Sequence, residues 1–274
     1  AVTSVRGPRL RSVLAAGSFY ERNGRPEEAR RLYEAFPNAG PETTALDTAL
    51  KRLQDGHVAL PFVNDARQGY AEALFEIAAS FFKDRAYEPA LIYVQMALHV
   101  RPDLDVGRIL LADIYVATEH YVDAVGAFRE VSPESPFRWS ARIRLANALN
   151  QAGELDQASK ELRALATERT ERADPLMALA DLFRSEERYK DAVSVYDEAI
   201  ERIAKIQQHH WTLFYARGMS LERIGQWPRA ESDLLRALEL QPDQPLVLNY
   251  LGYSWVDMGM RLSEARSMIE RAVA

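Results

Sequence analysis

Residues 214–242 read FYARGMSLERIGQWPRAESDLLRALELQP, and the spacing of their small and apolar residues decides the fold. Gly218 lies in a first helical stretch, and Ala230 lies in a second one with Leu234 four positions further on. Spacings of three and four residues place side chains on one face of a helix. A turn signal at Gly225 separates the two stretches. The segment therefore predicts two amphipathic helices joined as a hairpin.

The same hairpin pattern recurs along the chain. Small residues stand at intervals of 34, 34, 34, 38 and 35 residues, and a bulky side chain follows each of them four positions later. The small residues are Ala90, Ala124, Ala158, Ala192, Ala230 and Ala265. Recurrence at this period is typical of stacked helix hairpins, in which each unit buries its apolar face against its neighbours.

The register divides the chain into two parts. Residues 1–70 hold one hairpin at about 10–43, an amphipathic helix at roughly Pro41 to Gln54, and an apolar segment, His57 to Val63, that we expect to dock on the repeats. Extra length around Ile203 to His210 predicts a longer helix or a wider turn. Residues 71–274 form the tandem run, which divides into 71–104, 105–138, 139–172, 173–206, 211–244 and an incomplete 245–274.

This pattern resembles the tetratricopeptide-repeat family. The resemblance implies an all-α, right-handed superhelical solenoid of helix-turn-helix repeats, and a non-enzymatic scaffold or adaptor that binds a protein or peptide in a concave groove. The segments Ser135 to Arg142 and Gln244 to Ser254 resemble long exported bacterial proteins of this family, some of them similar to an outer-membrane lipoprotein adaptor of a carboxy-terminal processing protease. This narrower resemblance implies a periplasmic or outer-membrane-anchored protein, with a cytoplasmic location as the alternative.

The resemblance also indicates where a partner binds. In this architecture the second, fifth, ninth and twelfth residues of each repeat face the concave wall, which we call the inner strip. From these positions we take the partner-binding groove to be Phe75, Phe82, Ile109, Asp113, Val116, Ile143, Asn147, Met177, Arg184, Tyr215, Met219 and Tyr253. Aromatic and methionine side chains suit an amphipathic helix or an extended peptide. The alternative is that these residues pack between adjacent helices or against the segment from Leu60 to Val63.

A polar cluster of Asn147, Arg144 and Arg184 could hold an acidic part of the partner. The alternative is that these residues lie on solvated helix faces. The acidic neighbours Glu231 and Asp233 are expected at a helix start or on an exposed face, where they support the helix dipole and solubility.

Composition and motifs argue against other classes of function. The net charge is -6 and no basic run tracks a phosphate backbone, so we expect no nucleic-acid partner. The chain has no cysteine, its five histidines show no two-ligand helical spacing, and no catalytic or phosphate-binding motif appears. We therefore predict no cofactor, no metal, no catalysis and no membrane span in this chain.

Two alternatives to an adaptor remain open. The chain stops at Ala274 within the second helix of a repeat, so we expect the native protein to continue beyond it. The apolar surface at that end could mediate self-association, which would make the chain a structural self-assembly module. The chain could also be an accessory domain of a larger protein. The region from Ala1 to Arg11 lacks the apolar core of a signal peptide, and we expect that any export signal was removed earlier.

Overall fold

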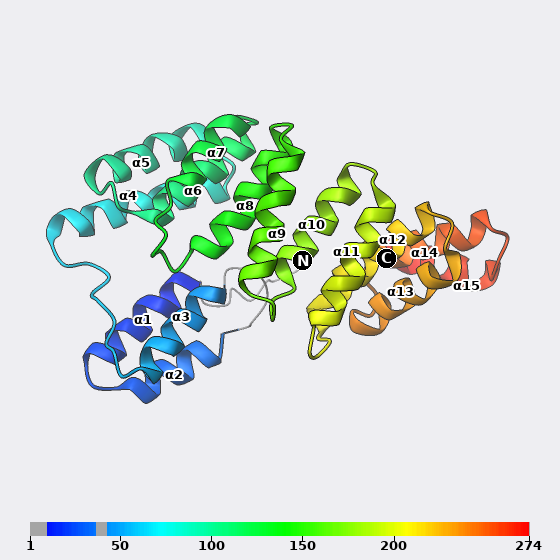
Figure 1. Ribbon diagram of the computed structural model, residues 1–274, viewed down its shortest axis with the longest axis horizontal. Coiled ribbons are helices and arrows are strands. Elements are labelled where there is room, and N and C mark those ends of the chain that lie inside the picture. The colour runs from blue at the N-terminus through cyan, green and yellow to red at the C-terminus, as the bar shows by residue number, and fades with distance from the viewer. Residues whose placement is uncertain (1–9, 37–42, 274) are drawn as a thin grey trace. The chain divides into compact units, whose positions relative to one another are not determined.

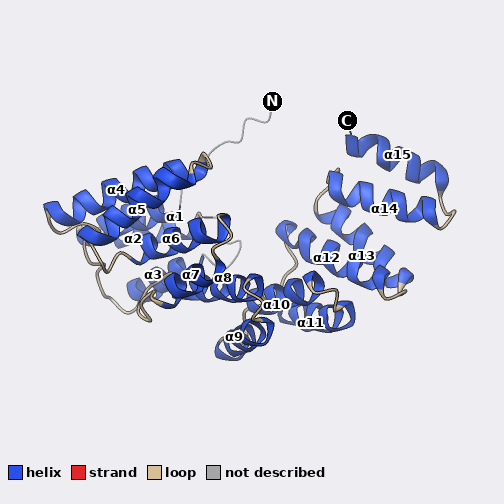
Figure 2. Ribbon diagram, turned by 90° about the horizontal axis from the view of Figure 1, so that it is seen from above, coloured by secondary structure: helices blue, strands red, loops and turns tan. Residues whose placement is uncertain are grey.

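The structure is a computed structural model that describes residues 10–36 and 43–273. Throughout these residues the regular secondary structure is helical, as the blue ribbons of Figure 2 show. Close contacts divide the chain into two compact units, Ala1–Glu161 and Leu162–Ala274. The repeat register predicts a domain boundary near residue 70. That boundary rests on the sequence pattern alone, and it stays a prediction. Each compact unit is described by itself.

The first unit holds the helices drawn from blue to green in Figure 1. They are α1 Leu10–Arg22, α2 Pro26–Glu34, α3 Thr44–Gln54, α4 Ala66–Lys83, α5 Tyr87–Val100, α6 Asp105–Ala117, α7 Tyr121–Arg129, α8 Arg138–Gln151 and the first part of α9 Leu155–Glu168. Consecutive helices pair as hairpins, with α1 against α2, α4 against α5 and α6 against α7.

The second unit continues the same scheme through the remainder of α9 and the helices drawn from yellow-green to red in Figure 1. They are α10 Asp174–Ser185, α11 Tyr189–Arg202, the short 3-10 helix η2 Gln208–His210, α12 Trp211–Arg223, α13 Trp227–Leu240, α14 Pro245–Asp257 and α15 Leu262–Val273. Here α10 pairs with α11, α12 with α13 and α14 with α15. The extra residues after α11 form a wider turn and η2.

Small residues allow the two helices of a hairpin to approach closely. The six register alanines are completely buried. A Cβ atom added to Gly252 would lie 2.9 Å from Ile269 Cγ1 and 3.1 Å from the Ala265 carbonyl oxygen. At Gly218, an added Cβ would lie 3.3 Å from the carbonyl oxygen of Ala230. The predicted all-α repeat of helix hairpins is therefore confirmed, and its register residues occupy the helix crossings.

The irregular region near the N-terminus is held together by a buried carboxylate. The described part of the predicted helix is α3, whereas residues 41 and 42 lie outside the described residues. Glu21 of α1 accepts hydrogen bonds from the Tyr33 hydroxyl at 2.7 Å, from Arg52 Nη2 at 2.7 Å and from the Ala59 N–H at 2.8 Å. Burial alone raises the pKa of Glu21, but these hydrogen bonds outweigh it and hold the pKa below its ordinary value.

The segment from His57 to Val63 lies against α1 through its backbone and through Phe62. The Ser18 hydroxyl donates to the Leu60 carbonyl oxygen at 3.0 Å, and Ala59 is buried. The Leu60 side chain is 85% exposed, whereas Phe62 is half-buried against the apolar core of α1, α2 and α3. Backbone hydrogen bonds and this one aromatic ring therefore dock the segment.

Candidate functional site

Two predicted groove residues of the first unit are buried. The Phe75 ring lies under the guanidinium of Arg11, whose central carbon is 4.4 Å from the ring centroid. Ile143 of α8 is also buried. Both side chains therefore pack inside the protein, as the alternative interpretation of the inner strip expects, and neither offers a free surface to a partner.

Arg11 is a half-buried residue that the sequence patterns do not reveal. Its guanidinium contacts Glu72, which also accepts a hydrogen bond from Arg101 Nη1 at 3.2 Å. Burial lowers the pKa of Arg11, and the nearby Glu72 carboxylate only partly opposes this effect. These side chains line a cavity of about 320 Å³ whose wall also includes Phe62 and Phe137. Arg11 and Glu72 are separated by 61 positions in the sequence, which explains why no local spacing predicts their contact.

The rest of the first unit's inner strip is partly exposed. Phe82, Ile109 and Val116 are half-buried, whereas Asn147 is exposed. Asp113 Oδ2 accepts a hydrogen bond from Arg144 Nη1 at 2.5 Å, which joins α6 to α8. The predicted polar cluster is therefore altered, because the Arg144 charge is already balanced by Asp113.

The second unit's inner strip carries an aromatic cluster. Tyr215 of α12 packs edge-on against Tyr250 of α14, with ring centroids 5.9 Å apart, and lies 6.2 Å from the Trp211 ring. Tyr253, one turn beyond Tyr250, is 53% exposed. Met219 is half-buried on the same helix as Tyr215. The second unit thus presents Tyr215, whose ring is supported by neighbouring rings, and Tyr253, whose side chain is exposed to solvent.

Tyr250 belongs to this cluster although the inner-strip positions exclude it. Its hydroxyl donates a hydrogen bond to Glu222 Oε2 at 3.0 Å. Burial, followed by the negative charge of Glu222, raises the pKa of Tyr250, so the hydroxyl stays protonated. An aromatic residue three positions before Tyr253 is the sequence signal that could have revealed it.

Polar groups border the strip on α10. The Tyr196 hydroxyl donates to Asp181 Oδ1 at 2.6 Å, and Arg184 Nη2 lies 3.4 Å from the same oxygen. The Arg184 side chain is partly exposed, and Met177 is half-buried on the same face of α10, about two turns nearer its start. Arg184 therefore offers a cation beside apolar surface, although Asp181 attenuates its charge.

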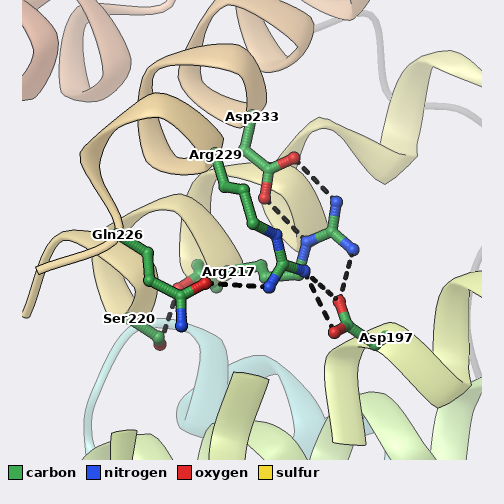
Figure 3. Close-up of polar contacts among 7 residues, drawn as sticks. Asp197, Arg217, Ser220, Gln226, Arg229 and Asp233 are labelled. Atoms are coloured by element: carbon green, nitrogen blue, oxygen red, sulfur yellow. Dashed lines mark hydrogen bonds and ion pairs between the residues drawn. The ribbon is translucent and has the colours of Figure 1, made fainter. Parts of the chain in front are cut away.

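A partly buried ion-pair network joins α11, α12 and α13, as Figure 3 shows. Arg217 donates from Nε and Nη2 to the two oxygens of Asp233, both at 2.7 Å, and from Nη1 to Asp197 at 2.7 Å. Arg229 binds Asp197 as well, at 3.0 Å. Asp233 is only 5% exposed, so its expected place on an exposed face is wrong.

The network occupies a position that is apolar in the other repeats. In the repeat register, Arg217 corresponds to Ile77, Leu111, Leu145, Leu179 and Leu251. Burial alone lowers the pKa of Arg217, but the ion pairs with Asp233 and Asp197 outweigh it and raise the pKa. The arginine is thus charged, bidentate on one carboxylate and held by a second one from the preceding hairpin.

The described residues form neither a cluster of metal-ligating side chains nor a helix that could span a membrane. Within them, no group of three or more histidine and acidic side chains is arranged to hold a metal ion. None of the described helices is both long enough and apolar enough to cross a lipid bilayer. The features that the site offers are an aromatic strip, adaptable methionines and a few paired charges.

Stacked helix hairpins with small residues at their crossings define a class of α-helical repeat protein. Two sequence profiles, both described as tetratricopeptide repeat, match this chain at residues 176–210 and at residues 109–175 and 215–274. Together they cover more than half of it. The chain belongs to the tetratricopeptide-repeat family, whose fold is generally a non-catalytic scaffold for protein-protein interaction.

Solved structures with the same fold have distant sequences. The crystal structure of the APC/C hetero-tetramer Cut9-Hcn1 aligns with 96% of this chain and 54% of that chain, at 13% identity and a TM-score of 0.56. The structure of MamA residues 41 to the end, from Desulfovibrio magneticus RS-1, aligns with 66% of this chain and 99% of that one, at 15% identity and a TM-score of 0.50. These likenesses concern the fold alone.

Curated relatives are longer than this chain. The TPR repeat-containing protein PA4667 of Pseudomonas aeruginosa is 27% identical over 150 residues, which cover 54% of this chain and 25% of that protein. The protein O-mannosyl-transferase TMTC1 of Homo sapiens is 24% identical over 169 residues, which cover 60% of this chain and 18% of that protein. The chain thus spans a quarter or less of these relatives.

Proposed function

We propose that the protein is a non-catalytic adaptor whose second unit binds a partner peptide or amphipathic helix along the inner strip. The observation that carries this proposal is the aromatic cluster, in which Tyr215 packs against Tyr250, and exposed Tyr253 follows one turn beyond Tyr250 on α14. Aromatic residues dominate the binding energy of many protein interfaces, because they bury a large area at low entropic cost. Full burial of Tyr253 would contribute on the order of 1.5–3 kcal/mol before ordering costs.

The neighbouring residues define the chemistry of the partner. Met219 and Met177 have flexible, polarisable side chains that adapt to apolar side chains of different shape. Arg184 lies close enough to Tyr215 to lower its pKa, although burial of Tyr215 has the larger and opposite effect. The strip therefore suits an apolar segment that carries an acidic residue or a carboxylate near Arg184.

The first unit offers a shorter contact surface of the same kind. Phe82 packs against the Tyr87 ring with centroids 5.8 Å apart, and Ile109 and Val116 are half-buried on α6. Asn147 is exposed on α8 and can bind backbone amides of an extended peptide. We propose that this strip contributes contacts to a partner without Phe75 or Ile143.

The resemblance of Ser135 to Arg142 and Gln244 to Ser254 to exported proteins supports a more particular role. We propose that the adaptor works in the bacterial periplasm or on the outer membrane and brings a protease or an envelope complex to its substrates. Fractionation of the native host tests the location, and recovery of the protein in the cytoplasmic fraction contradicts it. A captured partner set without a protease or an envelope protein contradicts the recruitment role.

Site-specific photocrosslinking tests the binding strip directly. A photoreactive phenylalanine analogue at position 253 should crosslink to one partner polypeptide, and Tyr215→Glu in the same chain should remove that product. The same analogue at Ser194, which is exposed on α11 in the same unit, is the matched control and should give no such product. Equal crosslinking from both positions, or an unchanged product in a folded Tyr215→Glu variant, contradicts the proposal.

Self-association is the second candidate function. Leu262 and Val273 on α15 and Met258 before it are exposed apolar side chains. Contiguous exposed apolar surface often marks a protein contact. Light scattering over a range of concentrations distinguishes the candidates, because a dimer that Leu262→Glu abolishes supports self-association, whereas a monomer at all concentrations supports the adaptor.

A further inference from the structure

The hairpin α4–α5 exposes an apolar face that the later hairpins bury. Ile77 of α4 is 40% exposed, whereas its register counterpart Leu111 is half-buried and Leu145, Leu179 and Leu251 are buried. All these side chains are large and apolar, so residue type does not account for the difference. The cause is a neighbouring helix that packs on the later hairpins.

In later hairpins this neighbour is the second helix of the preceding hairpin. Within the first unit α7 packs against α8, and within the second unit α11 packs against α12 and α13 against α14. In the part of the chain that the structure describes, α3 instead packs against α1 and α2, as Figure 1 also shows. The helices α4 and α5 pack against α6, and α4 also contacts Arg11 of α1 through Glu72 and Phe75.

Contacts between α9 and α11 show which residues face such a neighbour. Arg163 Nη1 of α9 donates to Glu198 Oε2 of α11 at 2.8 Å. Arg202 Nη1 donates to the Ala166 carbonyl oxygen of α9 at 2.7 Å. In the repeat register, Glu198 corresponds to Met96, and Arg202 corresponds to Val100. The side of α5 that carries Met96 and Val100 is therefore the side on which a preceding second helix lies.

On α5 this side is apolar and hollowed. Met96 and Val100 line a groove of about 340 Å³ together with Tyr70, Leu74, Ile92 and His99. Ile92 is 57% exposed and Met96 is 42% exposed. The register counterparts of Ile92 are small or polar residues, namely Gly126, Lys160, Ser194, Ser232 and Ser267. The groove is therefore a departure of this one hairpin from the chain's own pattern.

We propose that the α4–α5 groove binds an amphipathic helix of another polypeptide, in the position that a preceding second helix occupies on the later hairpins. The second helices α5, α9, α11 and α13 each have 14 residues, which sets the expected length of the bound helix. Since Met96 replaces Glu198, the bound helix carries an apolar residue where α9 carries Arg163. This surface is separate from the inner strip, and its occupant extends the existing stack of helices.

A helical peptide derived from α9 is the probe. It has the sequence of residues 155–168 with leucine in place of Arg163, is stapled on its solvent face and carries a fluorophore. Fluorescence anisotropy with the full chain should show saturable binding. Met96→Glu in the protein, or glutamate instead of leucine at position 163 of the peptide, should weaken binding at least about tenfold, because each places an unpaired charge in the apolar contact.

Ala164→Glu in the protein, with the peptide unchanged, is the matched control. Ala164 is the exposed register counterpart of Met96 on α9. This variant should leave the affinity unchanged. Lack of saturable binding to the wild-type chain overturns the proposal, and so does equal affinity for a folded Met96→Glu variant. Both substitutions lie at exposed positions, so we expect both variants to fold. Circular dichroism checks that they do.

Disulfide exchange distinguishes a partner helix from a second copy. The chain contains no cysteine, so Met96→Cys introduces its single thiol. The probe peptide now carries cysteine at position 163. In a thiol-disulfide buffer, the yield of its mixed disulfide with the Met96→Cys protein should be at least about tenfold higher than with the Ala164→Cys protein. A disulfide-linked homodimer that forms in preference to the peptide adduct assigns the groove to a second copy and overturns the proposal.

Discussion

The packing interface, or joint, between α7 and α8 and the one between α11 and α12 carry opposite kinds of residue at the same repeat position. Leu145 of α8 is buried as an apolar side chain, whereas Arg217 of α12 is held by Asp233 and Asp197. An apolar joint requires only that its side chains fit together. A charged joint also requires its partners in place, because a buried charge that loses its partner is costly. The α11/α12 joint is therefore the more specific one and the more vulnerable to a single substitution.

Removal of the arginine should have the largest effect. Arg217→Ala leaves Asp233 buried without its cation, and we expect a loss of about 3–5 kcal/mol in the free energy of unfolding. Chemical denaturation followed by helical circular dichroism measures it. Arg229→Ala is the control, since that residue is half exposed and contributes about 0–1 kcal/mol through Asp197. A loss below about 1 kcal/mol for Arg217→Ala would show that Asp233 finds water or another donor.

Conversion of the charged joint into an apolar one should restore stability. The preceding hairpin carries Leu179 and Val195 at the positions of Arg217 and Asp233. We therefore expect the double variant Arg217→Leu/Asp233→Val to regain most of the loss, because apolar replacements of a buried ion pair are often neutral or stabilising by about 1–4 kcal/mol. If the double variant is as unstable as Arg217→Ala, the network provides more than charge neutralisation. A thermal melt of the three proteins side by side decides this.

The buried carboxylate of the first unit extends the comparison to pH. The folded-state pKa of Glu21 is depressed relative to its ordinary value of 4.5. Its contribution to stability is therefore fully present above pH 4.5 and is lost as the pH falls through the depressed folded-state pKa. Glu21→Gln should cost about 1.5–3 kcal/mol at neutral pH, since it weakens the hydrogen bonds from Arg52 and Tyr33.

The measurement is the free energy of unfolding between neutral and acidic pH. The difference between wild type and Glu21→Gln should shrink as the pH falls below 4.5. Glu27→Gln is the control, because that side chain is 70% exposed on α2. A difference that stays constant with pH would mean that Glu21 contributes through packing alone.

Glycines within hairpins give the smallest and most discriminating effects. Gly252→Ala should destabilise by about 1–3 kcal/mol, because the new methyl group meets Ile269 and the Ala265 carbonyl oxygen. Gly126→Ala in α7 should instead stabilise by about 0.4–1 kcal/mol, since its added Cβ meets open space. Opposite signs in thermal unfolding support close helix approach at Gly252, and equal effects contradict it.

Much of the fold and part of the candidate site could be predicted from the residues alone. The buried register alanines and the close approach at Gly218 follow from local spacing, because a helix crossing admits only small side chains. The exposure of Tyr253 agrees with its inner-strip position. The burial of Phe75 could not be predicted, because the residue that covers it, Arg11, lies in another helix and contacts it through the irregular N-terminal packing.

The sequence by itself determined the repeat, its register and the all-α class, because these depend on spacings of three, four and about 34 residues. Only the tertiary structure decided which members of that pattern are covered. Asp233 is buried because α12 supplies Arg217 across 16 residues, and Ile77 is exposed because α3 packs elsewhere. Burial depends on the neighbours of a helix, and a local pattern carries no information about a neighbour that is charged or missing.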